Sequence, residues 1–218
     1  MSADEVLKFF EQLSPFWRDF AETQFYMAAR VGEVAGLQVE SVDFFERVIV
    51  VRHVAVFART SKAFDYLKDV PKNGEERFIF LNDKLFEILS RRIASAKSGY
   101  VFHENGLPLT YRVIQYQYNH ALKKAGLYPR FSSTHIMRHS MGTITRRVTG
   151  SLDAAQAVTG HKDIKMAQHY ASMPTDTNKK AVNEVNLYMR NLEEKSDRGV
   201  EKAKANSDQR VLRLVDKD

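Results

Sequence analysis

The segment from Ser132 to Tyr170 constrains the fold of this 218-residue chain more than any other stretch. Two apolar runs at helical spacing predict two helices, and the Thr149-Gly150-Ser151 step separates them. One of the three hydroxyl residues at 132–134 can cap the first helix, and Asp163 can cap a third, short one. The pattern therefore predicts successive helices joined by tight breaks.

Four residues of this segment can act together on an anion. His135 and Arg138 stand three residues apart, so that a helix places both on one face. His161 follows Gly160 at the exit of the second helix, and Tyr170 lies near the end of the third. Such a group of side chains can bind a phosphate and attack it.

The same residues carry a family resemblance. The pattern H-x-x-R at His135 and Arg138, followed by Gly160-His161 and then by Tyr170 nine residues later, resembles the C-terminal half of a tyrosine recombinase. That family includes the integrases of phages and integrative elements and the chromosome-dimer resolvases.

Two upstream motifs complete the resemblance. Ala29-Arg30-Val31-Gly32-Glu33 is similar to the first arginine motif of the family, and Pro71-Lys72-Asn73-Gly74 is similar to its lysine hairpin. The five motifs stand in family order and span about residues 20 to 190. The resemblance implies six catalytic residues, which are Arg30, Lys72, His135, Arg138, His161 and Tyr170. It also implies that Glu33 orients the basic cluster through hydrogen bonds.

Each implied role suits the chemistry of its side chain. Arg30 and Arg138 hold the non-bridging phosphate oxygens, because the arginine fork binds two oxygens and keeps its charge. Tyr170 is the nucleophile, and His135 is the base that accepts its proton. His161 braces the transition state through a hydrogen bond.

Lys72 is implied to protonate the 5′-oxygen as it leaves. Residues 67–70 and 76–81 flank Lys72-Asn73-Gly74, and Asn-Gly is a strong hairpin signal, so we expect a hairpin with Lys72 in its turn. Lys62 and Lys68 are rivals for the same role, because strand register cannot be observed from sequence.

The sequence does not indicate a metal centre. His135 and His139 have the i, i+4 spacing of a zinc pair, but no nearby carboxylate or thiol completes a ligand set, and the chain has no cysteine. We therefore expect no metal and no cofactor, with side-chain cations neutralising the phosphodiester during transfer.

Charge is distributed unevenly along the chain. The net charge is +6, and no carboxylate occurs between Asn105 and Leu152. Such a stretch suits contact with phosphates, and a solvated basic face is the alternative. Besides Arg138, its bases are predicted to bind DNA; they are Arg112, Lys123, Lys124, Arg130, Arg146 and Arg147.

The remaining patterns predict a mainly helical fold with a small antiparallel sheet, an α+β arrangement like the catalytic domains of the DNA breaking-rejoining enzymes. Residues 1–29 indicate two helices, and 82–96 and 111–125 indicate two more. Residues 42–56 are rich in Val, Ile and Phe and indicate strand.

We expect two parts: a catalytic domain at 1–192 and a charged tail at 193–218. The tail is poor in apolar residues before 211–215, so it docks in trans on another protomer, packs in cis or stays mobile. The 29 residues before Arg30 are too few for the N-terminal DNA-clamping domain of the family, so we expect that domain to be absent from this chain.

The implied function is that of a site-specific DNA recombinase or integrase, which cleaves and rejoins strands through a covalent 3′-phosphotyrosyl bond without metal. The expected partner is double-stranded DNA, with a homotetramer on DNA and a monomer when free. No apolar run can cross a membrane, and a cytoplasmic, nucleoid-associated protein of prokaryotic or phage origin is expected. The alternatives are relaxation of DNA like a type IB topoisomerase and a non-catalytic DNA-binding module on the same fold.

Overall fold

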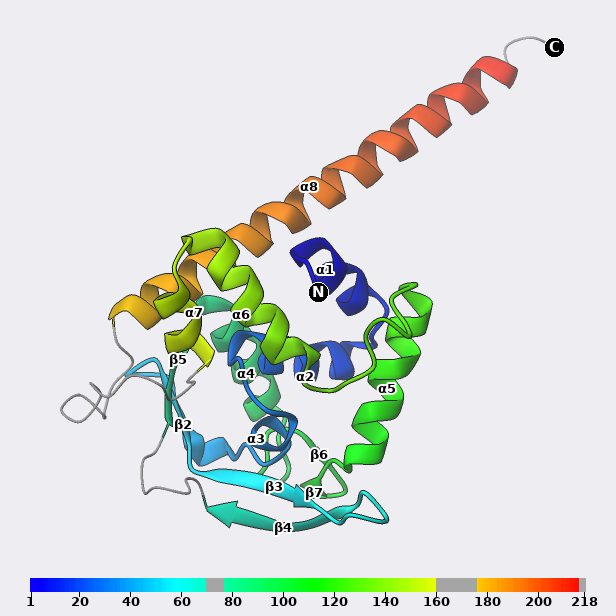
Figure 1. Cartoon of the computed structure of the whole chain (residues 1–218). Helices are drawn as coiled ribbons and strands as arrows, with labels where there is room; N and C mark the ends of the chain where they lie inside the picture. The colour runs from blue at the N-terminus through cyan, green and yellow to red at the C-terminus, as the bar shows by residue number, and fades with distance from the viewer. Residues whose placement is uncertain (70–76, 160–175, 216–218) are drawn as a thin grey trace. The chain divides into compact units, whose positions relative to one another are not determined.

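The structure, a computed structural model, describes residues 1–69, 77–159 and 176–215, and in the last segment the side chains of 178–198 (Figure 1). The chain divides into two compact units, Met1–Asn186 and Leu187–Asp218. The first unit carries every described residue of the candidate site.

Helices dominate the first unit, with short antiparallel strands beside them. The helices are α1 (Ala3–Glu11), α2 (Pro15–Tyr26), α3 (Val31–Ala35), η1 (Val39–Ser41), α4 (Asp83–Ala94), α5 (Tyr111–Lys124), α6 (Ile136–Thr149), α7 (Leu152–Thr159) and the start of α8 (Asp176–Val215). The strands are β1 (Val42–Asp43), β2 (Val48–Val51), β3 (His53–Phe57), β4 (Phe64–Asp69), β5 (Arg77–Phe80), β6 (His103–Glu104) and β7 (Leu107–Pro108). The predicted mainly helical α+β fold is confirmed.

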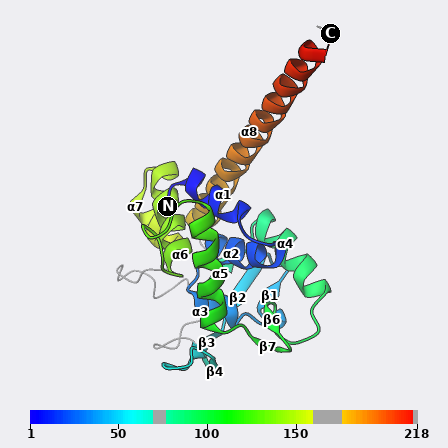
Figure 2. The same ribbon diagram turned by 90° about the vertical axis from the view of Figure 1, so that its right-hand side faces the viewer.

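Helix α2 forms the centre of the first unit. Its residues from Asp19 to Tyr26 are all buried, so this helix has no solvent-exposed face in that stretch. It packs against α4 and α6, and Phe20 meets Tyr118 of α5 edge-to-face with ring centroids 6.4 Å apart. In both views α2 lies among α4, α5 and α6 (Figures 1 and 2).

Most predicted helix ends agree with the structure, and one does not. Asn82 and Thr110 accept backbone N–H groups at the starts of α4 and α5, at 2.8 and 3.3 Å. Gly150 ends α6 in the left-handed conformation, at φ 68°. The predicted cap of α6 was wrong: the N-cap residue is His135, whose side chain makes no capping bond.

The predicted hairpin around Lys72 was also wrong. β4 pairs with β3, and β5 pairs with β2, so the two strands that flank residues 70–76 do not pair with each other. Instead the two strands pair with successive parts of residues 48–57: β5 with β2 and β4 with β3. Asn-Gly is a local turn signal, and it contains no information about the competing partners β3 and β2, with which the two strands pair. The true hairpin joins β3 to β4 through residues 58–63.

Helix α3 lies directly on β3 because its contact face is made of glycine. A Cβ added at Gly32 would stand 2.7 Å from the Ala55 carbonyl oxygen, and one at Gly36 would stand 2.7 Å from the Ala55 nitrogen. The glycine of the predicted arginine motif is therefore needed for backbone contact, and this contact fixes the strand beside Arg30.

Helix α8 begins in the first unit and continues into the second. Within the first unit, Asn178 donates to the Ala157 carbonyl of α7 at 3.1 Å, and Val185 is fully buried. In the second unit, Glu194 pairs with Arg190 and Arg198 at i±4 spacing. The docking of the tail stays a prediction. Among the described residues no helix is both long and apolar enough to cross a membrane.

Gly32→Ala is expected to destabilise the first unit by roughly 1–3 kcal/mol, because the added methyl group overlaps the backbone of β3. In a protein of this size that lowers the melting temperature by about 2–4 °C per kcal/mol. Thermal unfolding followed by circular dichroism measures the change. Gly99→Ala is the control, since a Cβ there meets no atom within 4 Å. Equal melting temperatures for the two variants would contradict the argument.

Candidate active site

The turn that precedes Arg30 is held by side chains from distant parts of the chain. Ala28 has φ 45°, a left-handed conformation that costs a non-glycine residue roughly 1–2 kcal/mol. Arg77 donates to the Met27 carbonyl at 2.6 Å, and Arg138 donates to the Ala28 carbonyl at 2.7 Å. These two carbonyls lie just beyond the last helical residue of α2, Tyr26. The turn is thus fixed where Arg30 begins α3.

Glu33 is the acidic centre of this cluster. It is 4% exposed, and one of its oxygens accepts both the backbone N–H of Arg30 and a guanidinium N–H of Arg77, each at 2.9 Å. The other oxygen accepts from the Arg30 side chain at 3.1 Å. Glu33 therefore joins Arg30 to β5, and the orienting role implied for it stays a prediction.

Positive charge exceeds negative charge in the cluster. In the described segments Arg30 and Arg77 pair with one carboxylate, that of Glu33, and no carboxylate there pairs with Arg138. Burial, followed by the charges of Arg77 and Arg30, lowers the pKa of Arg138 to about 10, against the opposite effect of Glu33. Burial likewise lowers the pKa of Arg77. Since Arg138 remains charged at neutral pH, an anion beside it would relieve this repulsion.

Arg30 is more exposed to solvent than Arg138 in this cluster. Its side chain is 57% exposed, whereas Arg138 is 5% exposed. A ligand can reach the Arg30 fork from solvent, while Arg138 supplies charge from beneath. This arrangement can bind a tetrahedral anion such as a phosphate.

Of the other four predicted catalytic residues, the structure describes one, His135. His135 is exposed at the start of α6, three residues before Arg138, so both belong to one turn. Lys72, His161 and Tyr170 lie outside the described residues. Their assignment stays a prediction. The described segments contain no group of three or more His, Asp or Glu side chains that could hold a metal ion.

Arg77 is the residue that sequence reasoning missed. In the sequence it lay within residues 76–81, which flank the expected hairpin turn, and no role was predicted for it. In the structure it bridges Glu33 to the Met27 carbonyl and so connects β5 to the arginine turn. A charged residue opening the apolar run Phe78-Ile79-Phe80 is a signal for a buried ion pair, and it could have revealed Arg77.

The strand register separates the rival lysines. Val51 pairs with Arg77, and Phe57 pairs with Phe64 at the other end of the same stretch. At about 3.3 Å per residue, the turn that contains Lys62 is roughly 20 Å along the strands from Arg77. Lys68 lies on β4, opposite Val54 and nearer to Arg77. Lys62 is therefore poorly placed for the arginine cluster.

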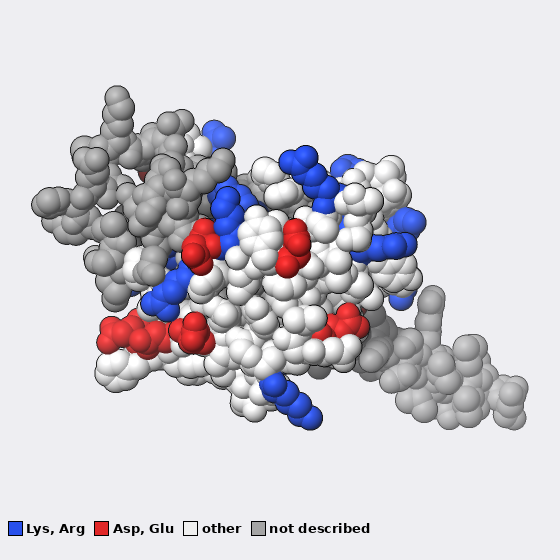
Figure 3. Space-filling model, turned by 90° about the horizontal axis from the view of Figure 1, so that it is seen from below, with Lys and Arg blue, Asp and Glu red and all other residues white. Residues whose placement is uncertain are grey.

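The predicted DNA-binding residues are exposed but lie on several elements. Arg112, Lys123 and Lys124 are on α5, Arg146 and Arg147 are in the last turn of α6, and Arg130 is between these helices. Arg130 pairs with Glu5, so its charge is partly balanced. The face that carries β3 and β4 exposes Lys and Arg interspersed with Asp and Glu (Figure 3). The DNA-binding assignment stays a prediction.

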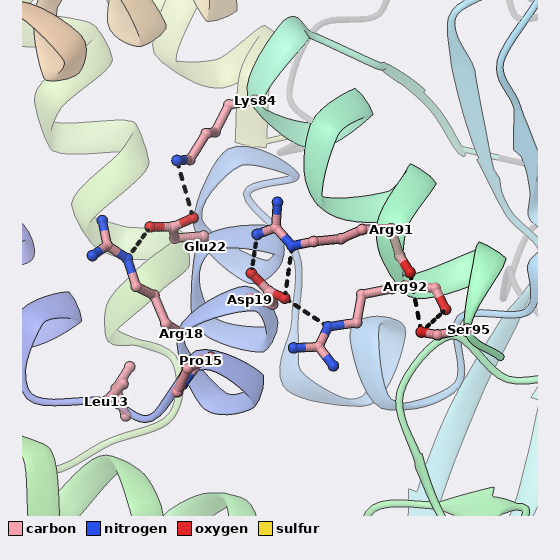
Figure 4. A pocket seen from close by; sticks show the side chains of 9 residues that line it. All are labelled: Leu13, Pro15, Arg18, Asp19, Glu22, Lys84, Arg91, Arg92 and Ser95. Atoms are coloured by element: carbon pink, nitrogen blue, oxygen red, sulfur yellow. Dashed lines mark hydrogen bonds and ion pairs between the residues drawn. The ribbon is translucent and has the colours of Figure 1, made fainter.

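A pocket of about 550 Å³ lies between α2 and α4 (Figure 4). Its floor contains the buried carboxylates of Asp19 and Glu22. Arg91 and Arg92 both pair with Asp19, the latter at 2.6 Å. Arg18 and Lys84 pair with Glu22 at 2.6 and 3.6 Å. Because each buried carboxylate is matched by two cations, the pocket is explained as an ion-pair clamp between the helices.

Comparison with known proteins bears on the whole first unit. Residues 2–176 match the Phage integrase family. Tyrosine recombinase XerA of Saccharolobus solfataricus is 26% identical over 147 residues, which are 67% of this chain and 42% of that protein. The chain thus spans about two fifths of the length of this relative.

Solved structures share the fold at low identity. The lambda integrase catalytic core superposes with a TM-score of 0.53 at 17% identity, covering 74% of this chain and 94% of that one. The Tn1549 transposon integrase in complex with transposon right end DNA gives a TM-score of 0.54 at 23% identity, covering 68% and 52%.

The excess charge of the cluster predicts stabilisation by phosphate. At ten times its Kd, a bound anion stabilises the fold by about 1.4 kcal/mol, which raises the melting temperature by roughly 3–5 °C. Phosphate should therefore raise it more than sodium chloride of equal ionic strength. Arg138→Met should abolish this difference, because it removes the buried positive charge; the lost bond to the Ala28 carbonyl lowers the melting temperature equally in both salts. Arg47→Met, outside the cluster, is the control. Equal effects of the two salts on the parent protein would contradict the prediction.

Proposed function

Because the chain belongs to the phage integrase family, we propose that it cleaves and rejoins DNA strands as the catalytic domain of a site-specific recombinase. The proposal rests above all on the arginine cluster, in which Arg30 and Arg77 pair with the Glu33 carboxylate and the buried guanidinium of Arg138 adds a third positive charge. Such an excess of fixed positive charge suits a phosphodiester, whose negative charge grows as the transfer proceeds.

Arg30 and Arg138 bind the two non-bridging oxygens of the scissile phosphate in this mechanism. Arg30 contributes an exposed fork oriented by Glu33, and Arg138 contributes a buried charge held by the Ala28 carbonyl. Because both groups are oriented before DNA binds, little reorganisation accompanies the transfer. Arg77 acts through Glu33 and the turn and does not touch the phosphate.

The transfer itself is assigned to residues proposed from the family motifs. The Tyr170 oxygen attacks phosphorus and His135 takes the phenolic proton. The bond from phosphorus to the 5′-oxygen breaks, and Lys72 gives that oxygen a proton. His161 donates a hydrogen bond to the phosphate in the transition state. A 3′-phosphotyrosyl bond results, and attack by a 5′-hydroxyl reverses the steps to rejoin the strand.

DNA is the proposed partner. The Tn1549 transposon integrase, which shares the fold, was solved in complex with transposon right end DNA. Strand exchange between two duplexes requires four cleavages, so we propose a homotetramer on DNA. Residues 193–218 are proposed to dock on a neighbouring protomer in that assembly.

Tyr170→Phe is expected to abolish formation of a covalent protein–DNA adduct, because the variant lacks the nucleophilic oxygen. The assay uses a nicked suicide substrate that carries a target site, followed by a denaturing gel. Binding of the same DNA, measured by gel shift, should be unchanged. Tyr188 lies on α8, and the control variant Tyr188→Phe should still form the adduct.

The outcomes separate the candidate functions. DNA binding without an adduct in the parent protein would support a non-catalytic DNA-binding module. An adduct that survives in Tyr170→Phe would show that another residue is the nucleophile. Relaxation of supercoiled plasmid without exchange of strands would support a topoisomerase.

Replacing both Lys123 and Lys124 with alanine should make duplex binding less dependent on salt. For B-DNA each lost phosphate contact reduces the slope of log K against log salt by about 0.9. A fluorescence-anisotropy titration at several salt concentrations measures the slope. The control replaces Lys8 and Lys97 with alanine; both residues lie outside residues 105–152, so the slope should stay unchanged. An unchanged slope in the first variant would remove the end of α5 from the interface.

A further inference from the structure

A buried glutamine joins the two turns that present the candidate catalytic residues. The Nε2 group of Gln24 on α2 donates to the Thr134 carbonyl at 2.9 Å and to the Ala29 carbonyl at 3.3 Å. Thr134 immediately precedes His135, and Ala29 immediately precedes Arg30. One amide group therefore holds together two backbone segments that are more than 100 residues apart in sequence.

The orientation of this amide is set by its partners. Both carbonyls are acceptors, so the NH2 end of Gln24 must face them. The opposite end, Oε1, accepts the hydroxyl of Tyr118 from α5 at 2.7 Å. Burial raises the pKa of Tyr118 well above its usual value, so the hydroxyl keeps its proton and donates. The amide has a donor or acceptor partner at each end and cannot rotate without losing them.

Burial makes this arrangement rigid. Gln24 and Ala29 are fully buried, and Thr134 and Tyr118 are 1% exposed. No water can replace a lost bond at low cost in such surroundings, so a change at Gln24 leaves carbonyls without donors. The turns would then move to find other partners.

We propose that Gln24 is a positioning residue, which sets the location of Arg30 relative to His135 for the transfer step. This proposal rests on the function proposed above. Gln24 touches neither substrate nor reacting atoms, and it acts through the backbone of the two turns. Arg77 and Arg138 already donate to the Met27 and Ala28 carbonyls of this turn, and Gln24 adds a bond to the next carbonyl, that of Ala29.

Gln24→Met is the direct test, because methionine has a similar length and no donor. The rate of adduct formation at saturating DNA should fall by about 10- to 100-fold, the loss expected for a shift of about 1 Å in a catalytic group. The Kd for DNA should stay within about threefold. All variants are assayed at a temperature where circular dichroism shows them to be folded.

Two further variants make the test specific. Thr23→Val is the control, since Thr23 is buried on the same helix and its hydroxyl has no partner. Tyr118→Phe keeps the ring packing and removes the bond that orients the amide, so it should slow adduct formation by about 3- to 10-fold. The double variant of Tyr118→Phe and Gln24→Met should form the adduct about as slowly as Gln24→Met alone, because Tyr118 acts only by orienting the Gln24 amide. Additive losses, or an unchanged rate in Gln24→Met, would overturn the proposal.

A second measurement does not depend on catalysis. Amide hydrogen exchange should accelerate at least tenfold in the peptides that contain residues 28–30 and 134–136 of Gln24→Met, and not in Thr23→Val. If the parent protein forms no adduct, the proposed function fails, while this exchange still tests the link between the turns. Unchanged exchange in both peptides would show that Gln24 does not position them.

Discussion

The first unit depends on a central helix, α2, whose buried carboxylates and amide require partners. Asp19 and Glu22 are 4% and 2% exposed, and they are neutralised by cations, including Arg91 and Arg92 of α4. Gln24 is satisfied by both site turns and by Tyr118. An unpaired polar group at these depths would cost about 1–3 kcal/mol, and an unpaired charge more. The elements around α2 are therefore fixed by the need to pair these polar groups, and not only by the burial of apolar surface.

The C-terminal end of α2 transfers this order to the candidate site. The carbonyls of Met27, Ala28 and Ala29, just beyond the last helical residue Tyr26, accept from three different side chains. The left-handed Ala28 turns the chain so that Arg30 can begin α3. Such a strained residue persists where its surroundings determine it several times over. The excess charge at Arg138 is the destabilising part of the same arrangement, and an anion would offset it.

Much of the fold followed from local patterns, whereas long-range pairing did not. The helices around Leu85 and Ile114 and the end of α6 at Gly150 agree with prediction because caps and apolar periodicity are encoded within a few residues. The hairpin at Lys72 was wrong because strand pairing depends on competing partners, which a local Asn-Gly signal does not contain. The α6 cap was wrong because the helix begins at Ile136, so that His135 and not one of the hydroxyl residues at 132–134 takes the N-cap position.

The sequence by itself determined the fold class and the family, and it proposed Arg30, Glu33, His135 and Arg138 as site residues. It could do so because motif spacing and helical periodicity are properties of short segments. The tertiary structure alone decided that Arg77 shares Glu33, that β4 and β5 follow one stretch and that Gln24 spans both turns. The two side-chain contacts, from Arg77 to Glu33 and from Gln24 to Thr134, join residues 44 and 110 positions apart. Which distant donor meets which buried carbonyl is settled by the packing of the whole unit.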